Sequence, residues 1–290
     1  MRKVLKWTGI VLGGLVLLLI VAGGAFYLVG SSKAFKTHEV QPASLTIPSD
    51  SASLAHGAHL AGIHGCVDCH GENLAGQVFV DAPPFLVTAA NLTSGKGGLG
   101  GTYSAIDFDR SLRHGVAKDG RSLYIMPSAA FHQMADSDAA ALIAYIQSVP
   151  PVDNELPKTE LRVPGLMMAA IALDPEYEVR PGPARSEDPP PVGTAAYGEY
   201  ITSITCSYCH GADLRGAQPP MPDSPVAPDL AAAGKWTLDQ FKNALRTGER
   251  PGREPMNQEY MPYQFTARMT DAELESLHAH LSTIVETGAN

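Results

Sequence analysis

Cysteine is scarce in this sequence, with four residues among 290. All four stand in two short C-x-x-C-H motifs, at residues 66–70 and 206–210. Since the motifs use every thiol, none is left for a disulfide bond or as a separate metal ligand. A disulfide-stabilised scaffold is therefore not expected, and the cysteines point to one chemistry at two places.

Positive charge is also in short supply. The chain has 21 Lys and Arg against 30 Asp and Glu, which gives a formal net charge of −9. Nucleic-acid binding needs Lys and Arg to meet phosphate groups, so the composition argues against it. An acidic surface favours transient protein partners with a basic face, although the same charge would also serve solubility alone.

Long apolar runs are absent apart from one near the N-terminus. Residues 7–29 carry no charge and follow three basic residues, Arg2, Lys3 and Lys6. As a helix, these 23 residues would span about 35 Å, enough to cross the hydrocarbon core of a bilayer. The basic residues predict that this end stays in the cytoplasm and that the rest of the chain lies outside. We predict a membrane anchor over residues 1–30; a signal peptide cleaved near Ala22–Ala25 is the alternative, and either one exports the chain.

The sequence repeats itself, which decides its organisation. Each C-x-x-C-H motif opens the pattern H-G-x-x-L-x-G, at residues 70–76 and 210–216. Later matches follow in the same order: Tyr103, Phe108, Leu112, Arg113 and Gly115 with Trp236, Phe241, Leu245, Arg246 and Gly248; Met126-Pro127 with Met261-Pro262; and Met134, Asp136, Asp138, Leu142 and Ile146 with Met269, Asp271, Glu273, Leu277 and Leu281. The chain therefore contains two copies of one module, at residues 53–150 and 192–290.

Each copy is predicted to be helical. Apolar residues recur at helical spacing at the end of each copy, and Thr270–Glu273 has the form of a capping box. Residues 107–114 and 240–247 indicate shorter helices, and no segment alternates as a strand would. We predict an all-α fold of two tandem domains behind one N-terminal transmembrane helix.

Two linkers complete this organisation. Residues 31–52 join the anchor to the first copy. Residues 151–191 join the copies and are rich in proline, which predicts an extended path along the surface. One short helix is expected within this second linker, at residues 165–173.

The C-x-x-C-H motif is typical of c-type haem attachment. Its two thiols add to the haem vinyl groups and the neighbouring histidine binds the iron. The predicted attachment residues are Cys66, Cys69, Cys206 and Cys209, with His70 and His210 as iron ligands. A zinc site would need four ligands, and a thioredoxin-like site would need a preceding strand, so two covalently bound haem c groups are the favoured interpretation.

Methionine is the predicted second ligand of each iron. Met126 and Met261 occupy equivalent places, and the proline after each one stiffens its loop. Met134 and Met269 also correspond, but each precedes a helix start and is predicted to be core. Met256 is a lesser rival without a counterpart. A methionine opposite histidine raises the reduction potential, as suits electron carriage.

Several other residues near the motifs are predicted to have lesser roles. Seven further histidines do not recur in register and are predicted to be structural or at the surface: 56, 59, 64, 114, 132, 278 and 280. Arg113 and Arg246 are predicted to pair with haem propionates, and Tyr103 and Trp236 to pack on the haem edge. Ordinary surface arginines and core aromatics remain open as the alternative.

Taken together, these motifs resemble the class I cytochrome c family over residues 54–150 and 192–285. The resemblance rests on C-x-x-C-H-G, a helix ending in Leu-Arg-x-Gly, a Met-Pro loop and an amphipathic closing helix. It implies a small helical fold around each haem, with crossing terminal helices. Two copies in one exported chain are similar to the cytochrome subunits of periplasmic dehydrogenases and respiratory complexes.

The resemblance implies electron transfer rather than catalysis. A membrane-anchored di-haem cytochrome would pass single electrons from a respiratory, photosynthetic or dehydrogenase donor to an oxidase or soluble carrier. Its expected partners are redox proteins, above all a membrane oxidoreductase complex, on the periplasmic side of a bacterial cytoplasmic membrane. A di-haem peroxidase is the alternative, but it needs an open iron site, and both copies keep their Met-Pro.

Overall fold

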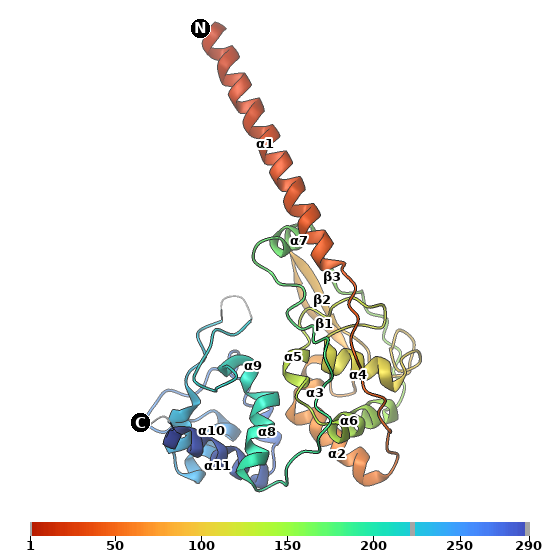
Figure 1. The fold of residues 1–290 in the computed structure, drawn as a ribbon, viewed down its shortest axis with the longest axis vertical. Helices are drawn as coiled ribbons and strands as arrows, with labels where there is room; N and C mark the ends of the chain where they lie inside the picture. The colour runs from red at the N-terminus through yellow and green to blue at the C-terminus, as the bar shows by residue number, and fades with distance from the viewer. Residues whose placement is uncertain (1, 221–223, 288–290) are drawn as a thin grey trace.

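One long helix projects from a two-lobed body in the computed structural model, which describes residues 2–220 and 224–287 (Figure 1). This helix, α1, runs over Arg2–Ala34 and contains the predicted apolar run. Within the described residues, α1 is the one helix long and apolar enough to cross a membrane. Its side chains from residue 4 to residue 21 are exposed, as a membrane-spanning helix requires.

The first lobe is built from five helices around a buried apolar core. They are α2 (Ser51–Ile63), α3 (Cys66–His70), α4 (Ala105–His114), α5 (Ser128–Phe131) and α6 (Asp136–Ser148). Helix α2 packs across α6, and Leu60, Leu142 and Ile143 are fully buried between them. The helices predicted at residues 107–114 and at the end of this copy are confirmed.

The second lobe repeats this plan. Its elements are α8 (Ala195–Thr205), α9 (Ser207–His210), the 3-10 helix η1 (Leu230–Lys235), α10 (Leu238–Thr247), the 3-10 helix η2 (Thr266–Arg268) and α11 (Asp271–Thr287). Helix α8 packs across α11 as α2 packs across α6. The predicted duplication therefore extends from sequence to architecture.

A glycine stands at each of these two helix crossings. A Cβ atom added to Gly57 would lie 2.1 Å from the carbonyl oxygen of Ala141, and one added to Gly198 would lie 2.0 Å from that of Ser276. Either distance is far below van der Waals contact, so only glycine permits the close approach. The crossing geometry is thus encoded at a single position in each copy.

Local sequence signals set the helix ends. Helix α4 begins with a capping box between Ser104 and Asp107, and α10 begins with the equivalent box between Thr237 and Gln240. Both helices end at a glycine in the left-handed region, with φ 67° and 82° respectively. The predicted box at α11 is confirmed, because Thr270 and Glu273 exchange hydrogen bonds between side chain and backbone.

The all-α prediction was wrong in one region. A three-stranded antiparallel sheet, in the order β1-β2-β3, contains β1 (Gln77–Ala82), β2 (Phe85–Ala89) and β3 (Glu160–Leu161). Strand β1 is mostly exposed and has a bulge, so its side chains never alternate in the way that marks a strand in sequence. The third strand comes from the linker, so the pairing joins segments about 75 residues apart. The fold is mostly helical rather than purely helical.

The segment between the copies is more structured than an extended surface linker. It contributes β3 and the short helix α7 (Val163–Ala169), which confirms the helix expected at residues 165–173 with shifted bounds. It also places Glu178, only 1% exposed, between the lobes. The Glu178 carboxylate accepts hydrogen bonds from the Ala129 amide of the first copy and the Tyr208 hydroxyl of the second.

The two lobes share one continuous apolar core cluster, and their polar contacts are reciprocal. His59 of α2 lies 2.8 Å from the Glu273 carboxylate of α11, while the Tyr200 hydroxyl of α8 lies 2.6 Å from the Asp138 carboxylate of α6. Asp138 and Glu273 are equivalent in the repeat, at the same position of their closing helices. Such reciprocity is the mark of an isologous interface between twofold-related units.

The same carboxylates also bind within their own lobes. His56 lies 2.7 Å from Asp138, and the Tyr197 hydroxyl lies 3.4 Å from Glu273. Between the lobes, His64 is 8% exposed and contacts the Thr205 hydroxyl across the interface at 3.2 Å. The lobes are therefore held by a buried network in addition to apolar packing.

Candidate functional site

Each C-x-x-C-H motif forms one short turn of helix, α3 or α9, directly after the helix that crosses the lobe. The four cysteines are free and half-buried. Burial raises the pKa of the Cys66 and Cys206 thiols to about 12. A zinc site requires thiolates, so these apolar surroundings disfavour zinc. Within the described residues, no group of three or more His, Cys, Asp and Glu side chains could hold a metal ion.

The motif histidines are oriented in the same way in both copies. The Nδ1 atom of His70 lies 2.7 Å from the Ala90 carbonyl oxygen, and that of His210 lies 2.8 Å from the Pro228 carbonyl oxygen. A carbonyl can only accept, so Nδ1 carries the proton and Nε2 keeps its lone pair in the neutral ring. Burial lowers the pKa of both histidines and favours this neutral form. Each Nε2 thus keeps a lone pair with which it could bind a metal. Iron binding by His70 and His210 stays a prediction.

The loop after each histidine has the same backbone conformation. Leu74 and Leu214 have φ of 57° and 59°, a left-handed conformation that is unusual outside glycine. Both side chains are buried, at 0% and 3% exposure, and their packing offsets the strain. Beyond them, the amides of Gly76 and Gly216 donate to the carbonyl groups of His70 and His210. The two sites are copies at atomic detail.

The two predicted methionine ligands lie in matching turns. The Ser128 amide donates to the Met126 carbonyl at 2.7 Å, and the Tyr263 amide donates to the Met261 carbonyl at 2.8 Å. Both methionine side chains are half-buried. Iron binding by Met126 and Met261 stays a prediction.

The other methionines differ in their burial. Met134 and Met269 are 0% and 2% exposed, which confirms their predicted place in the core. Met256 is half-buried, and its amide donates to the Gly248 carbonyl beyond α10.

The two arginines bind carboxylates of the chain itself. Arg113 is fully buried and pairs with Asp109 and with Asp136 at the start of α6. In the second copy, Arg246 pairs with Asp271 at the start of α11. Each arginine thus ties its helix to the first turn of the closing helix. Nη2 of Arg113 is buried and has no hydrogen-bond partner among the residues that the structure describes. The contact with a haem propionate stays a prediction for both arginines.

The predicted edge aromatics are both half-buried against the core. Tyr103 packs edge-on against Phe108, with ring centroids 5.5 Å apart, and its hydroxyl accepts a hydrogen bond from the Lys118 amide. Trp236 packs on the core of the second lobe, and its carbonyl accepts a hydrogen bond from His278. A role at the haem edge stays a prediction for both.

The histidines outside the motifs bind protein groups, as predicted for structural residues. His114 and His132 contact the backbone carbonyls of Arg180 and Arg113 at 2.7 and 2.9 Å. His56, His59 and His64 contribute to the interface between the lobes.

The contact of Glu178 with Tyr208 was missed from sequence, although Tyr208 stands inside the second motif. Burial raises the pKa of Glu178. Comparison of the copies could not find this residue, because Glu178 lies in the linker and has no counterpart. Only the meeting of the lobes brings it to the motif.

Comparison with known proteins agrees with this geometry. The family model named Cytochrome c matches residues 54–150 and 195–284, well over half of the chain. The chain belongs to the cytochrome c family. Its family predicts covalently bound haem c, and the free cysteine pairs and prepared Nε2 atoms fit that group. The resemblance inferred from the motifs is confirmed.

Several curated relatives are named as cytochrome subunits of dehydrogenases. The fructose dehydrogenase cytochrome subunit of Gluconobacter japonicus is 34% identical over 50% of this chain and 31% of its own length. The cytochrome c subunit of alcohol dehydrogenase (quinone) of Gluconacetobacter polyoxogenes is 28% identical over 75% of this chain and 53% of its own. The gluconate 2-dehydrogenase cytochrome c subunit of Pantoea cypripedii is 29% identical over 69% and 52% respectively. This chain thus spans about a third to a half of the length of these relatives.

Proposed function

We propose that this chain is a membrane-anchored di-haem electron-transfer subunit that takes single electrons from a dehydrogenase partner and passes them to a further acceptor. The observation that carries the proposal is the identical preparation of His70 and His210 beside two free cysteines in each copy. One such site makes a cytochrome. Two sites in lobes that share a core make a path for electrons.

The residues at each site would have different roles. The cysteines would attach the group, the histidine would bind its iron, and haem supplies one-electron chemistry by alternating between ferrous and ferric iron. Met126 and Met261 would occupy the remaining axial positions and leave no room for a substrate. This arrangement supports electron transfer over the peroxidase alternative, which needs an open iron.

The proposed partner is the catalytic subunit of a dehydrogenase. The relatives named above are cytochrome subunits of fructose, alcohol and gluconate dehydrogenases. The net charge of −9 suits association with a basic face on such a partner. The substrate oxidised by that partner is a property of the catalytic subunit.

The proposed location is the outer side of a bacterial cytoplasmic membrane. Helix α1 supplies the anchor, and Arg2, Lys3 and Lys6 would hold its N-terminal end in the cytoplasm. The mass of the mature protein tests retention of α1, and resistance of the membrane-bound protein to carbonate extraction tests anchoring. A mature N-terminus near Ala25 would show instead that α1 is a cleaved signal.

The haem proposal is tested by counting haems. Protein purified from membranes should contain two haems per chain by mass and by its pyridine haemochrome spectrum. The paired change Cys206→Ala and Cys209→Ala should halve that content and leave the first site loaded. Ser207→Ala, within the same motif, is the matched control and should keep both haems. Full haem content in the double cysteine variant, or one equivalent of carbon monoxide bound by the reduced wild type, would contradict the proposal.

A further inference from the structure

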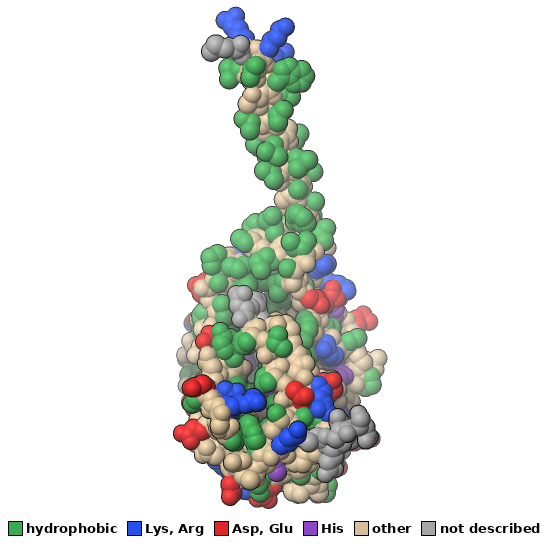
Figure 2. Space-filling model, turned by 90° about the vertical axis from the view of Figure 1, so that its left-hand side faces the viewer, with side chains coloured by type: hydrophobic (Ala, Val, Ile, Leu, Met, Phe, Trp, Pro, Cys, Tyr) green, Lys and Arg blue, Asp and Glu red, His purple; other side chains and the backbone are tan. Residues whose placement is uncertain are grey.

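A short uncharged helix packs against the outer end of α1. Residues 163–173, which contain α7, carry no charge and are flanked by Arg162 and Asp174. Three of their apolar side chains are exposed: Val163 by 58%, Met168 by 38% and Ile171 by 73%. Figure 2 shows hydrophobic side chains continuing from the projecting helix onto the adjoining end of the body.

The packing of α7 fixes its level along α1. A Cβ atom added to Gly30 would lie 1.6 Å from the Leu166 carbonyl oxygen, and one added to Gly23 would lie 3.8 Å from Cε of Met167. The Lys33 ammonium donates to the Ala170 carbonyl at 3.4 Å. Helix α7 therefore lies beside α1 at Gly30 and Lys33, and the Met167 side chain reaches back along α1 to Gly23.

The rise of about 1.5 Å per residue along an α-helix gives the depth of this contact in the membrane. Gly23 lies about 24 Å along the axis from Trp7, the first residue of the apolar run, and the hydrocarbon core of a bilayer is about 30 Å thick. If Trp7 marks the inner boundary, Gly23 and its neighbour Met167 lie within the outer half of the core. The backbone of α7 lies beside Gly30 and Lys33, about 35 and 39 Å along the axis from Trp7, at the level of the outer headgroup region. The exposed side chains of α7 then lie in the lipid interface rather than in bulk water.

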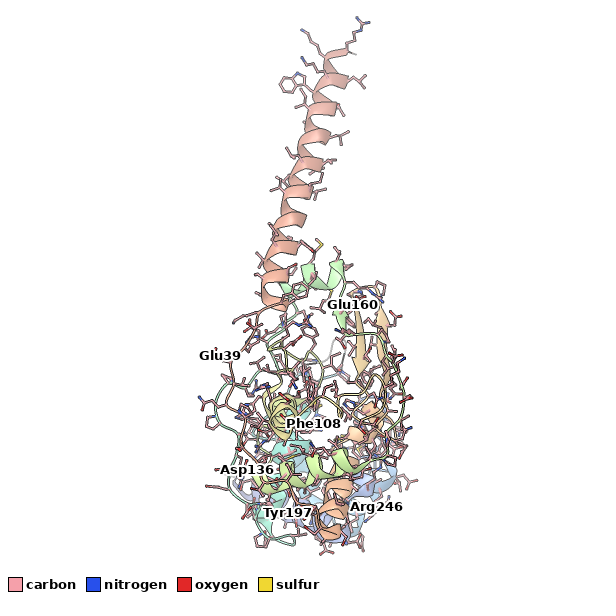
Figure 3. The ribbon with its side chains drawn as sticks, turned by 90° about the vertical axis from the view of Figure 1, so that its right-hand side faces the viewer. Glu39, Phe108, Asp136, Glu160, Tyr197 and Arg246 are labelled. Carbon is pink, nitrogen blue, oxygen red and sulfur yellow. The ribbon has the colours of Figure 1, made fainter. Side chains whose placement is uncertain are left out.

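Hydrogen bonds and an ion pair join the start of α7 to the body. The Arg162 amide donates to the Pro84 carbonyl at 2.9 Å, and the Arg162 guanidinium donates to the Ala82 carbonyl and pairs with Asp81. Strand β3 leads directly into α7, as the position of Glu160 shows (Figure 3). The hairpin of β1 and β2 thus holds α7 at a fixed position along the axis of α1.

We propose that residues 163–173 insert into the outer leaflet of the bilayer beside α1, as a second membrane contact that fixes the height and tilt of the haem-binding lobes. The proposal rests on the membrane anchor proposed above. The occupant of the exposed face is phospholipid, since the face continues the lipid-facing surface of α1 and lies at the level of the outer headgroup region.

The test uses Ile171→Cys in the full-length holoprotein, reconstituted into phospholipid nanodiscs that leave both membrane faces open to reagent. The matched control is Val192→Cys, an exposed apolar position (51%) at the start of the second lobe. Wild-type protein gives the background, because its four thiols would be held in thioether bonds. An impermeant charged maleimide should label Cys at 171 several-fold more slowly than Cys at 192, because a thiol packed among lipid molecules is shielded from the reagent and ionises less.

A second measurement identifies what covers position 171. Benzophenone-maleimide is attached to each variant in detergent before reconstitution, and ultraviolet light should then add the mass of a phospholipid at 171 and not at 192. Equal labelling rates with no lipid adduct, in protein that stays in the nanodisc, would overturn the insertion and leave the anchor intact. Slow labelling without a lipid adduct would assign the face to protein and overturn the proposal. Protein that fails to enter nanodiscs would overturn the anchor, and the depth argument with it.

Discussion

At the scale of single residues, this chain repeats its chemistry with little variation. The imidazoles of His70 and His210 each donate to a carbonyl about twenty residues ahead, and Leu74 and Leu214 share a strained conformation. Such agreement is expected where a rigid group dictates the surrounding backbone. The residues that differ between the copies, such as Arg113 and Arg246 in their burial, are those that act on the protein itself.

Met126 offers a direct test of axial ligation. Met126→Ala should lower the potential of one haem, within the range of about 0.8 V over which axial ligands act, and should open that iron to carbon monoxide. A redox titration of the haem bands and carbon monoxide difference spectra measure both effects. Met256→Ala is the control and should change neither. An unaltered titration for Met126→Ala would show that another residue binds the iron.

Gly198 tests the helix crossing of the second lobe. Gly198→Ala places a methyl group 2.0 Å from the Ser276 carbonyl, so α8 and α11 must separate. We expect a loss of about 1–3 kcal/mol in the free energy of unfolding, measured by denaturant titration. Gly182→Ala, whose added methyl group meets nothing within 4 Å, should leave stability nearly unchanged. Equal stability of the two variants would contradict the crossing.

At the scale of elements, α2 and the residue directly after it carry three histidines of the interface between the lobes. Burial lowers the pKa of His64 to about 4, and the hydrogen bond that His56 donates to Asp138 raises the pKa of His56. The two histidines therefore give the free energy of unfolding opposite dependences on pH. Their balance should place the most stable pH near neutrality.

His64 gives the clearer pH dependence. Between pH 6.5 and pH 4, the unfolded chain takes up a proton that buried His64 does not, so stability falls as the pH falls through this window. The shift corresponds to at most about 3 kcal/mol. His64→Leu should flatten this part of the profile, measured by urea unfolding at a series of pH values.

His56 provides the control of opposite sign. Its raised pKa contributes stability below the ordinary histidine value, and that contribution is lost as the pH rises through the folded-state pKa. His56→Gln should remove this loss on the alkaline side and leave the acid side unchanged. A profile that His64→Leu does not alter would show that the ring is solvated.

At the scale of the whole molecule, the two lobes form an internal pseudo-dimer. The contacts of His59 with Glu273 and of Tyr200 with Asp138 are equivalent under exchange of the copies, and Glu178 of the linker fills the space between them. A rigid interface sets one distance between the haem-binding motifs. An electron path requires this, because a flexible tether would vary that distance.

Breaking the reciprocal contacts should uncouple the lobes. The double variant His59→Ala and Tyr200→Phe leaves both buried carboxylates without their partner from the other lobe, at about 1–3 kcal/mol for each lost hydrogen bond. Calorimetry should then resolve two unfolding transitions where the wild type has one. Tyr260→Phe, at an exposed tyrosine, should keep the single transition. Two transitions already present in the wild type would refute the coupling.

Much of this architecture followed from sequence. The repeat placed the helices, the capping box at Thr270 and the core residues Met134 and Met269, because each rests on local spacing that periodicity records. The strands β1 and β2 were missed, because neither alternates and their third partner, Glu160–Leu161, lies far along the chain. Pairing between segments so far apart in the chain produces no pattern in the local sequence.

For the candidate site, too, some features followed from the sequence and others only from the tertiary structure. By itself the sequence determined that two C-x-x-C-H motifs exist, and it predicted which histidines serve a haem at each, because covalent attachment demands fixed residues at fixed spacing. Only the tertiary structure decided that Arg113 and Arg246 bind carboxylates, that Glu178 meets Tyr208 and that α7 packs against α1 beside Gly30. Each of these depends on which distant segments pack together, and packing is a property of the whole chain rather than of any motif.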